Sequence, residues 1–112
     1  MSDERTARGR SGERLAAAYL TLRGYRVMAR RLRTPAAEID LLCRRGRTLV
    51  IVEVKTRRAG AWVEADASLS PWQRDRLARA ASLLLGRTPW ARAVRVDLVA
   101  IDGWRVRLLR DV

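Results

Sequence analysis

The chain has 112 residues, 48% of them hydrophobic, and its 24 basic and 12 acidic residues give a formal net charge of +12. This length and composition predict one folded domain with a modest core and exclude a disordered tail. The chain has no histidine, which excludes histidine-based acid–base catalysis and histidine metal ligands, and its charge makes nucleic acid the leading candidate partner, ahead of an acidic membrane surface.

The N-terminal segment 1–10 is charged and lacks the apolar stretch of a signal peptide. We expect this segment to be flexible and residues 11–112 to form the single domain. No apolar run approaches the length of a membrane span, and one cysteine, Cys43, cannot form an intrachain disulfide. We therefore expect a cytoplasmic protein that makes no membrane contact.

Residues 11–24, "SGERLAAAYLTLRG", are predicted to form a helix that Ser11 caps and Gly24 stops. The apolar face of this helix, expected to pack inward, carries Leu15, Tyr19 and Leu22. Residues 25–33 alternate apolar residues with arginines, which predicts a half-buried strand with one basic face.

Residues 38–44 and 48–55 are predicted to form a hairpin with a two-residue turn at Arg45 and Gly46. The run 49–52 is apolar throughout, as expected for a central strand that is covered on both faces. The hairpin therefore belongs at the centre of a sheet that has a helix on each side.

The rest of the chain predicts a loop at 57–68, a helix at 70–86 capped by Ser70, and a strand pair at 93–101 and 104–110. The full order is then helix, three strands, helix and two strands. This order predicts a small α/β domain with a mixed central sheet flanked by helices.

The predicted hairpin brings acidic residues onto one face of the sheet. Glu53 and Lys55 share a face because strand side chains alternate. The assumed turn pairs Asp40 with Ile51, so Asp40 becomes the diagonal neighbour of Glu53 at about 7–8 Å along the backbone. Carboxylates at this spacing can share one divalent ion such as Mg²⁺.

The lysine at position 55 is the only lysine among the 24 basic residues. A lysine can orient a water through its ammonium or deprotonate a water through its neutral amine, because its pKa shifts readily, whereas an arginine stays charged. Taken singly, the residues have simpler explanations: a surface Glu53–Lys55 ion pair, a surface Asp40, and a helix-dipole role for Glu13. Together, an acid, a Glu-x-Lys strand and a basic chain indicate a metal-dependent phosphodiesterase centre.

The segments "SGERLAAAYLTLRGYRVMARRLR", "AEIDLL", "TLVIVEVKTR" and "RVDLVAI" resemble the YraN family of small bacterial proteins over residues 12–102. The resemblance implies the PD-(D/E)xK nuclease superfamily, a restriction-endonuclease-like fold similar to that of Holliday-junction resolvases, and Mg²⁺ or Mn²⁺ as cofactor. It implies that Asp40 and Glu53 are metal ligands. It also implies catalytic roles for Asp40, Glu53, Lys55 and Glu13. Glu38 matches the first acid of the "EID" motif, and its role is left open. It also implies a homodimer, although no apolar stripe in the sequence demands one.

Three positions depart from the family's pattern: Ala37 replaces a glycine, Arg31 an asparagine and Gln73 a lysine. Phosphate contacts are expected from the arginine-rich strand at residues 30, 31 and 33, above all Arg33, and from Arg57 and Arg58 after the Glu-x-Lys motif. Gln73 is expected in an auxiliary position of the nucleic-acid-binding set. Trp62 is a candidate either for stacking on an unpaired base or for local packing. Trp72, Trp90 and Trp104 are expected in the core or at an interface.

We therefore expect hydrolysis of phosphodiester bonds in DNA, with branched or single-stranded DNA among the candidate substrates and DNA favoured over RNA. The alternative is a nucleic-acid-binding module that keeps the nuclease fold without cutting, because folds outlast their activities. A basic protein associated with RNA or the ribosome is a weaker third interpretation.

Overall fold

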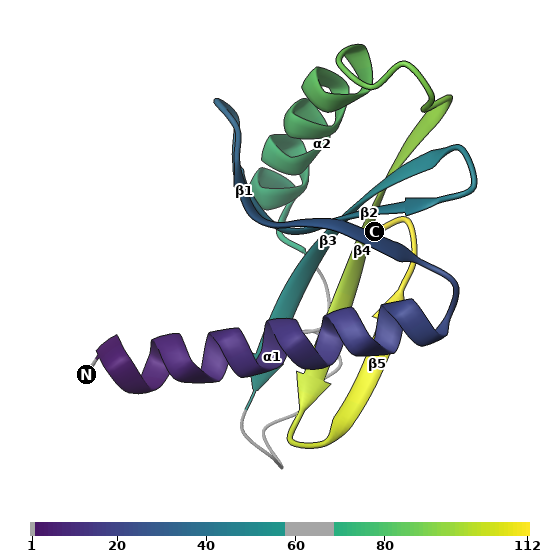
Figure 1. Ribbon diagram of the computed structural model, residues 1–112. Coiled ribbons are helices and arrows are strands. Elements are labelled where there is room, and N and C mark those ends of the chain that lie inside the picture. Colours follow the sequence, from purple (N-terminus) through teal and green to yellow (C-terminus); the bar gives the residue numbers. More distant parts are fainter. Residues whose placement is uncertain (1, 58–68) are drawn as a thin grey trace.

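The computed structural model describes residues 2–57 and 69–112, and the side chains of 11–56 and 69–112. The elements follow the predicted order (Figure 1): α1 (Ser2–Leu22), β1 (Arg26–Arg33), β2 (Glu38–Arg45), β3 (Thr48–Arg57), α2 (Pro71–Gly86), β4 (Ala93–Asp102) and β5 (Arg105–Leu109). No helix in the described part of the chain is long and apolar enough to cross a membrane. Arg58 and Trp62, and all but the first residue of the predicted loop 57–68, lie outside the described residues.

The sheet has five strands in the order β1-β2-β3-β4-β5. Neighbouring strands are antiparallel except β3 and β4, which are parallel and are connected through α2. Figure 1 shows α1 lying across one face of the sheet, and α2 packs against the other face. The predicted mixed sheet flanked by helices is confirmed, and it is consistent with a restriction-endonuclease-like fold.

The central strand β3 is covered on both faces, as predicted. Val50 and Val52 belong to the core under α1, whereas Leu49 and Ile51 belong to the core under α2. All four side chains are fully buried. Because side chains alternate along the strand, neighbouring residues of β3 pack against different helices.

The inward face of α1 differs from the prediction. Leu22 is 89% exposed, whereas Ala16 and Leu20 are fully buried. Gly12, four residues before Ala16, lies so close to β3 that a Cβ at this position would collide with the hydroxyl of Thr56. The inner face therefore combines the small residues Gly12 and Ala16 with Leu20, and the predicted Leu15 packs partly against the same core.

Helix α1 begins earlier than predicted and ends where the sequence predicted. The helix begins at Ser2 and not at Ser11, so the helical backbone continues through most of the segment that was predicted to be flexible. Its stop at Gly24 is confirmed, since this residue adopts a φ of +90° and the Tyr25 N–H donates to the Leu20 carbonyl at 3.0 Å. A glycine takes this left-handed conformation at little cost.

The turn between β2 and β3 is one residue later than predicted. Arg45 pairs with Thr48, so the turn consists of Gly46, with a φ of +61°, and Arg47. Each β2 residue therefore faces a β3 partner two positions further along than expected. A shift of two residues leaves every side chain on its predicted face, although it changes the neighbours.

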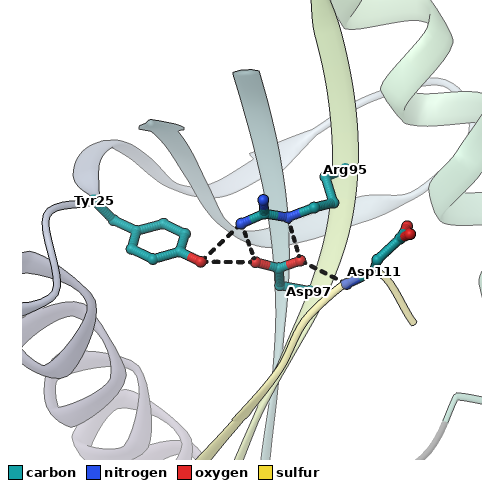
Figure 2. Close-up of polar contacts among 4 residues, drawn as sticks. All are labelled: Tyr25, Arg95, Asp97 and Asp111. Atoms are coloured by element: carbon teal, nitrogen blue, oxygen red, sulfur yellow. Dashed lines mark hydrogen bonds and ion pairs between the residues drawn. The ribbon is translucent and has the colours of Figure 1, made fainter. Parts of the chain in front are cut away.

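A buried carboxylate, Asp97, joins distant parts of the chain (Figure 2). It is 0% exposed and accepts hydrogen bonds from the Tyr25 hydroxyl at 3.1 Å and from the Asp111 N–H at 2.9 Å. Arg95 donates to both of its oxygens, from Nε at 2.9 Å and from a terminal nitrogen at 2.9 Å. This network connects the start of β1, strand β4 and the C-terminal segment.

Cys43 is buried in the core under α1. Burial and the charge of Asp97 raise the pKa of its thiol to about 12. The thiolate is the reactive form of cysteine, so Cys43 is a structural residue.

Candidate metal centre

A cavity of about 250 Å³ lies between the sheet and the first turns of α2. Helix α2 begins after Ser70, which caps it by accepting a hydrogen bond from the Gln73 N–H at 3.2 Å. The first turns of the helix therefore lie beside the cavity. Acidic side chains come from β2 and β3, and the other wall comes from α2. The lining residues are Ala37, Glu38, Asp40, Glu53, Gln73, Arg76 and Leu77.

Asp40 and Glu53 meet in this cavity because β2 and β3 separate here. The last pair between the two strands is Leu41 and Val52, so the next residues along each strand are Asp40 and Glu53. Oδ2 of Asp40 accepts a hydrogen bond from the Val54 N–H at 2.8 Å, in place of a main-chain partner. The observed register brings the two carboxyl groups closer than the diagonal spacing that was predicted.

Burial raises the pKa of both carboxyl groups. The pKa of Glu53 rises to about 7 through burial and the adjacent Asp40, and the pKa of Asp40 rises mainly through burial. The Val54 N–H opposes the rise at Asp40 because it stabilises the charged carboxylate. A proton shared by the pair therefore belongs on Glu53, which donates it to Asp40.

Lys55 lies on the same side of the sheet as the two acids. Strand β3 stays in regular register with β4 from Glu53 to Lys55, so these two side chains share a face. The Lys55 and Arg76 charges lower the pKa of Glu53, although burial has the larger effect. The three residues of the predicted centre thus lie on one face of the sheet, and of the three only Asp40 and Glu53 line the cavity.

Glu13 does not line this cavity. It comes from α1, and its Oε1 accepts a hydrogen bond from Arg31 Nε at 2.8 Å. Its charge still contributes to the raised pKa of Asp40. Glu13 is therefore an electrostatic neighbour of the centre, and the further metal or water contact expected for it remains a prediction.

The model of the uncharacterised protein family UPF0102 matches residues 12–101. The chain belongs to this family. A UPF0102 protein of Parvibaculum lavamentivorans is 57% identical over 109 residues, covering 87% of this chain and 80% of the relative. UPF0102 protein mlr4633 of Mesorhizobium japonicum is 46% identical over 100 residues, covering 88% and 78%, and a relative from Anaeromyxobacter dehalogenans is 43% identical over 100 residues, covering 88% and 75%. The predicted resemblance to the YraN family is confirmed.

Arg31 stands where the resemblance led us to expect an asparagine. This residue adopts a φ of +51° within β1. Asparagine, the residue that the resemblance expects here, tolerates this left-handed conformation better than arginine. The ion pair with Glu13 is the compensating contact for the arginine.

The predicted phosphate-binding residues of this UPF0102 protein are only partly brought together. Gln73 lines the cavity, whereas Arg33 lies at its rim, 89% exposed and 3.4 Å from Glu38. An exposed ion pair of this kind contributes little to stability, so Arg33 can exchange Glu38 for another anion. Arg57 is described only as the last residue of β3.

Sequence reasoning missed Arg76 in the cavity wall and the exposure of two tryptophans. Trp72 is 67% exposed and Trp104 is 91% exposed, so neither is a core residue. Trp90 is half-buried, and the Arg44 guanidinium lies 4.1 Å from the centroid of its ring. Arg76 is one helical turn after Gln73, and this spacing on α2 was the available signal.

The donor atoms of the cavity fit Mg²⁺ or Mn²⁺, which prefer carboxylate oxygens. Among the side chains of residues 11–56 and 69–112, no group of three or more histidine, cysteine or acidic residues is arranged to hold a metal ion. Two carboxylates alone suit Mg²⁺, which usually keeps several waters and takes further oxygens from substrate phosphates. Asp40 and Glu53 would therefore hold such an ion together with its substrate.

Replacing Glu53 with glutamine is expected to raise the melting temperature of the metal-free protein more at about pH 8 than at about pH 5. The folded protein keeps the Glu53 proton up to a pKa of about 7, against a usual value of 4.5. The folded state therefore binds more protons than the unfolded state in this window, and the free energy of unfolding falls as pH rises through it. Glutamine can still donate to Asp40 and has no such proton to lose.

Thermal unfolding across this pH range, followed by circular dichroism, measures the effect. The control is Glu38→Gln, which removes an exposed acid from the rim of the same cavity. A melting-temperature difference between Glu53→Gln and the wild-type protein that does not change with pH would contradict the raised pKa.

Proposed function

We propose that this UPF0102 protein is a metal-dependent nuclease that hydrolyses phosphodiester bonds of DNA in the cytoplasm. The observation that carries the proposal is that Asp40 and Glu53 line one cavity. The positive charge of Lys55 lowers the pKa of Glu53, which supports a centre made of all three residues. The net charge of +12 supports a polyanionic substrate. Membership of the UPF0102 family supports the assignment of the Asp40 and Glu-x-Lys motif. The two carboxyl groups in one cavity support metal-dependent hydrolysis.

Asp40 and Glu53 are the proposed ligands of Mg²⁺ or Mn²⁺. A divalent ion there would act as a Lewis acid on a phosphate oxygen and would lower the pKa of a bound water. Metal ligands must be deprotonated, so Glu53 has to release its proton for binding. Binding should therefore strengthen as pH rises through the Glu53 pKa of about 7.

Lys55 is the proposed positioning group for the attacking water. Its ammonium can hold the water in line with the phosphorus and stabilise the negative charge that develops on the phosphoryl oxygens. The water oxygen then forms a bond to phosphorus as the bond to the leaving oxygen breaks. The proton lost by the attacking water passes to solvent, and a solvent water protonates the leaving oxygen.

The second candidate function is a binding module that holds nucleic acid without cutting it. One feature favours it: Glu53 lies beside Asp40 with a pKa raised to about 7, so a proton held between the two acids can relieve their repulsion in place of an ion. The same basic chain would supply the affinity for phosphates.

Incubation with single-stranded, nicked, branched and duplex DNA and with RNA, in Mg²⁺, Mn²⁺ or EDTA, separates the two functions. We expect cleavage of at least one DNA with metal and none in EDTA. We also expect Mn²⁺ to raise the melting temperature of the wild-type protein and not of Asp40→Asn, because a ligand stabilises only the state that binds it. Equal binding of DNA in Mg²⁺ and EDTA, without product, would favour the binding module.

A further inference from the structure

Trp72 is a large aromatic side chain left in solvent beside the candidate metal centre. It lies in the first turn of α2 and is 67% exposed. The guanidinium of Arg76 lies over its ring, 4.6 Å from the centroid. A cation is attracted to the face of an aromatic ring, so the Arg76 guanidinium restricts the rotation of the Trp72 indole. Much of the Trp72 ring remains exposed to solvent.

Arg76 connects this tryptophan with the acidic cavity. Its Nε donates to the Ala36 carbonyl at 3.2 Å, which fixes the side chain at the cavity wall. It lines the same cavity as Asp40 and Glu53, and its charge lowers the pKa of Glu53. Gln73, the other polar residue of this wall from α2, is neutral, so Arg76 is the α2 residue able to pair with a phosphate there.

We infer that Trp72 and Arg76 form a nucleotide-binding subsite in which Arg76 holds a phosphate and Trp72 stacks on an unpaired base. An arginine guanidinium matches phosphate oxygens in geometry and charge. Aromatic side chains bind bases by stacking whatever the sequence, because every base has a π-face. The inference rests on the proposed function and specifies its substrate.

The substrate class follows from the accessibility of bases. In a continuous duplex both faces of a base are covered by its neighbours, so a tryptophan at the rim of a cavity cannot stack on it. Single-stranded tails, gaps and branch points leave base faces free. The subsite therefore favours a strand that has an unpaired base next to the phosphate held in the cavity.

The chain supplies a matched control for each residue. Trp104 is also exposed, at 91%, but it lies in the turn between β4 and β5 and lines a different cavity, which Gly12 and Ile101 share. Arg74 is an exposed arginine of α2 that does not line the cavity of Asp40 and Glu53.

The test measures binding by fluorescence anisotropy in the Asp40→Asn background with Mg²⁺ present, so that cleavage does not interfere. The probes are one labelled single-stranded oligonucleotide and a blunt duplex of the same sequence. We expect Trp72→Ala to weaken single-strand binding about tenfold with little effect on the duplex, and Trp72→Phe to retain most of the affinity. Trp104→Ala should leave both affinities nearly unchanged.

Arg76→Ala should weaken binding of both probes more than Arg74→Ala does, because a phosphate contact is independent of base pairing. Equal effects of Trp72→Ala and Trp104→Ala, or equal losses on single strand and duplex, overturn the subsite. If the unmodified protein cuts no substrate, the nuclease proposal fails while the binding comparison still decides the subsite. If neither probe binds, the subsite fails, whereas the nuclease proposal is still decided by cleavage with the unmodified protein.

Discussion

Replacing Asp40 with asparagine is expected to reduce metal-dependent cleavage by a factor of about 10²–10³ or more, and replacing Lys55 with alanine is expected to do the same. Asparagine keeps an oxygen that can accept the Val54 N–H, so the strand geometry should survive. It removes the charge that a divalent ion requires. The alanine at position 55 removes the ammonium that positions the water.

The replacement Lys55→Arg distinguishes charge from shape. A guanidinium restores the positive charge near Glu53, yet it is a planar fork and not a compact point charge. We expect Lys55→Arg to recover little of the activity lost in Lys55→Ala. This outcome would explain why a chain that otherwise uses arginine has a lysine at position 55.

Initial cleavage rates under single-turnover conditions, with the melting temperature of each variant, measure these effects. The control is Asp75→Asn, which removes an exposed acid of α2 that does not line the cavity. Cleavage that persists in both Asp40→Asn and Lys55→Ala would assign it to another site or to a contaminant. Loss of activity in Asp75→Asn would mean that net charge, and not the centre, controls the rate.

The sequence predicted the face of each acid better than the distance between them. Alternation along β2 and β3 depends on parity alone, and a two-residue error in register leaves parity unchanged. The distance depends on the turn, and Gly46 fits either of two turn positions in the sequence. A glycine between arginines therefore did not determine whether Asp40 lies diagonal to Glu53 or next to it.

The orientation of each helix depended on contacts that no local pattern contains. Leu15, Tyr19 and Leu22 predicted the inner face of α1, whereas the helix meets the sheet through Gly12, Ala16 and Leu20 and leaves Leu22 exposed. For the same reason the sequence did not show which residues of α2 reach the cavity. Arg76 lies one helical turn after Gln73, but its place in the cavity wall depends on how α2 docks on the sheet.

Replacing Asp97 with alanine is expected to lower the free energy of unfolding by about 3 kcal/mol or more, the usual effect of breaking a buried ion pair by removing one partner. Asp97 is fully buried and accepts from Tyr25, Arg95 and Asp111, as Figure 2 shows. Alanine leaves these donors without their acceptor. The Arg95 side chain is 24% exposed, so water can satisfy part of its guanidinium and keep the loss near the lower limit.

Two further variants separate the ion pair from the rest of the network. Tyr25→Phe removes one neutral donor and should cost about 1 kcal/mol. Replacing both charged partners, with Arg95→Met and Asp97→Leu together, should recover much of the stability lost in Asp97→Ala, because apolar residues of similar volume can replace a buried pair.

Urea unfolding of the four proteins gives the free energies, and a change of about 3 kcal/mol corresponds to roughly 10–20 °C in melting temperature for a domain of this size. The network lies away from the acidic cavity, so Tyr25→Phe should leave metal-dependent cleavage at the wild-type rate. If Asp97→Ala costs no more than Tyr25→Phe, the carboxylate does not hold β4 and the C-terminal segment together. In that case the pairing of β4 with β3 and β5 is enough to fix the C-terminal half of the sheet.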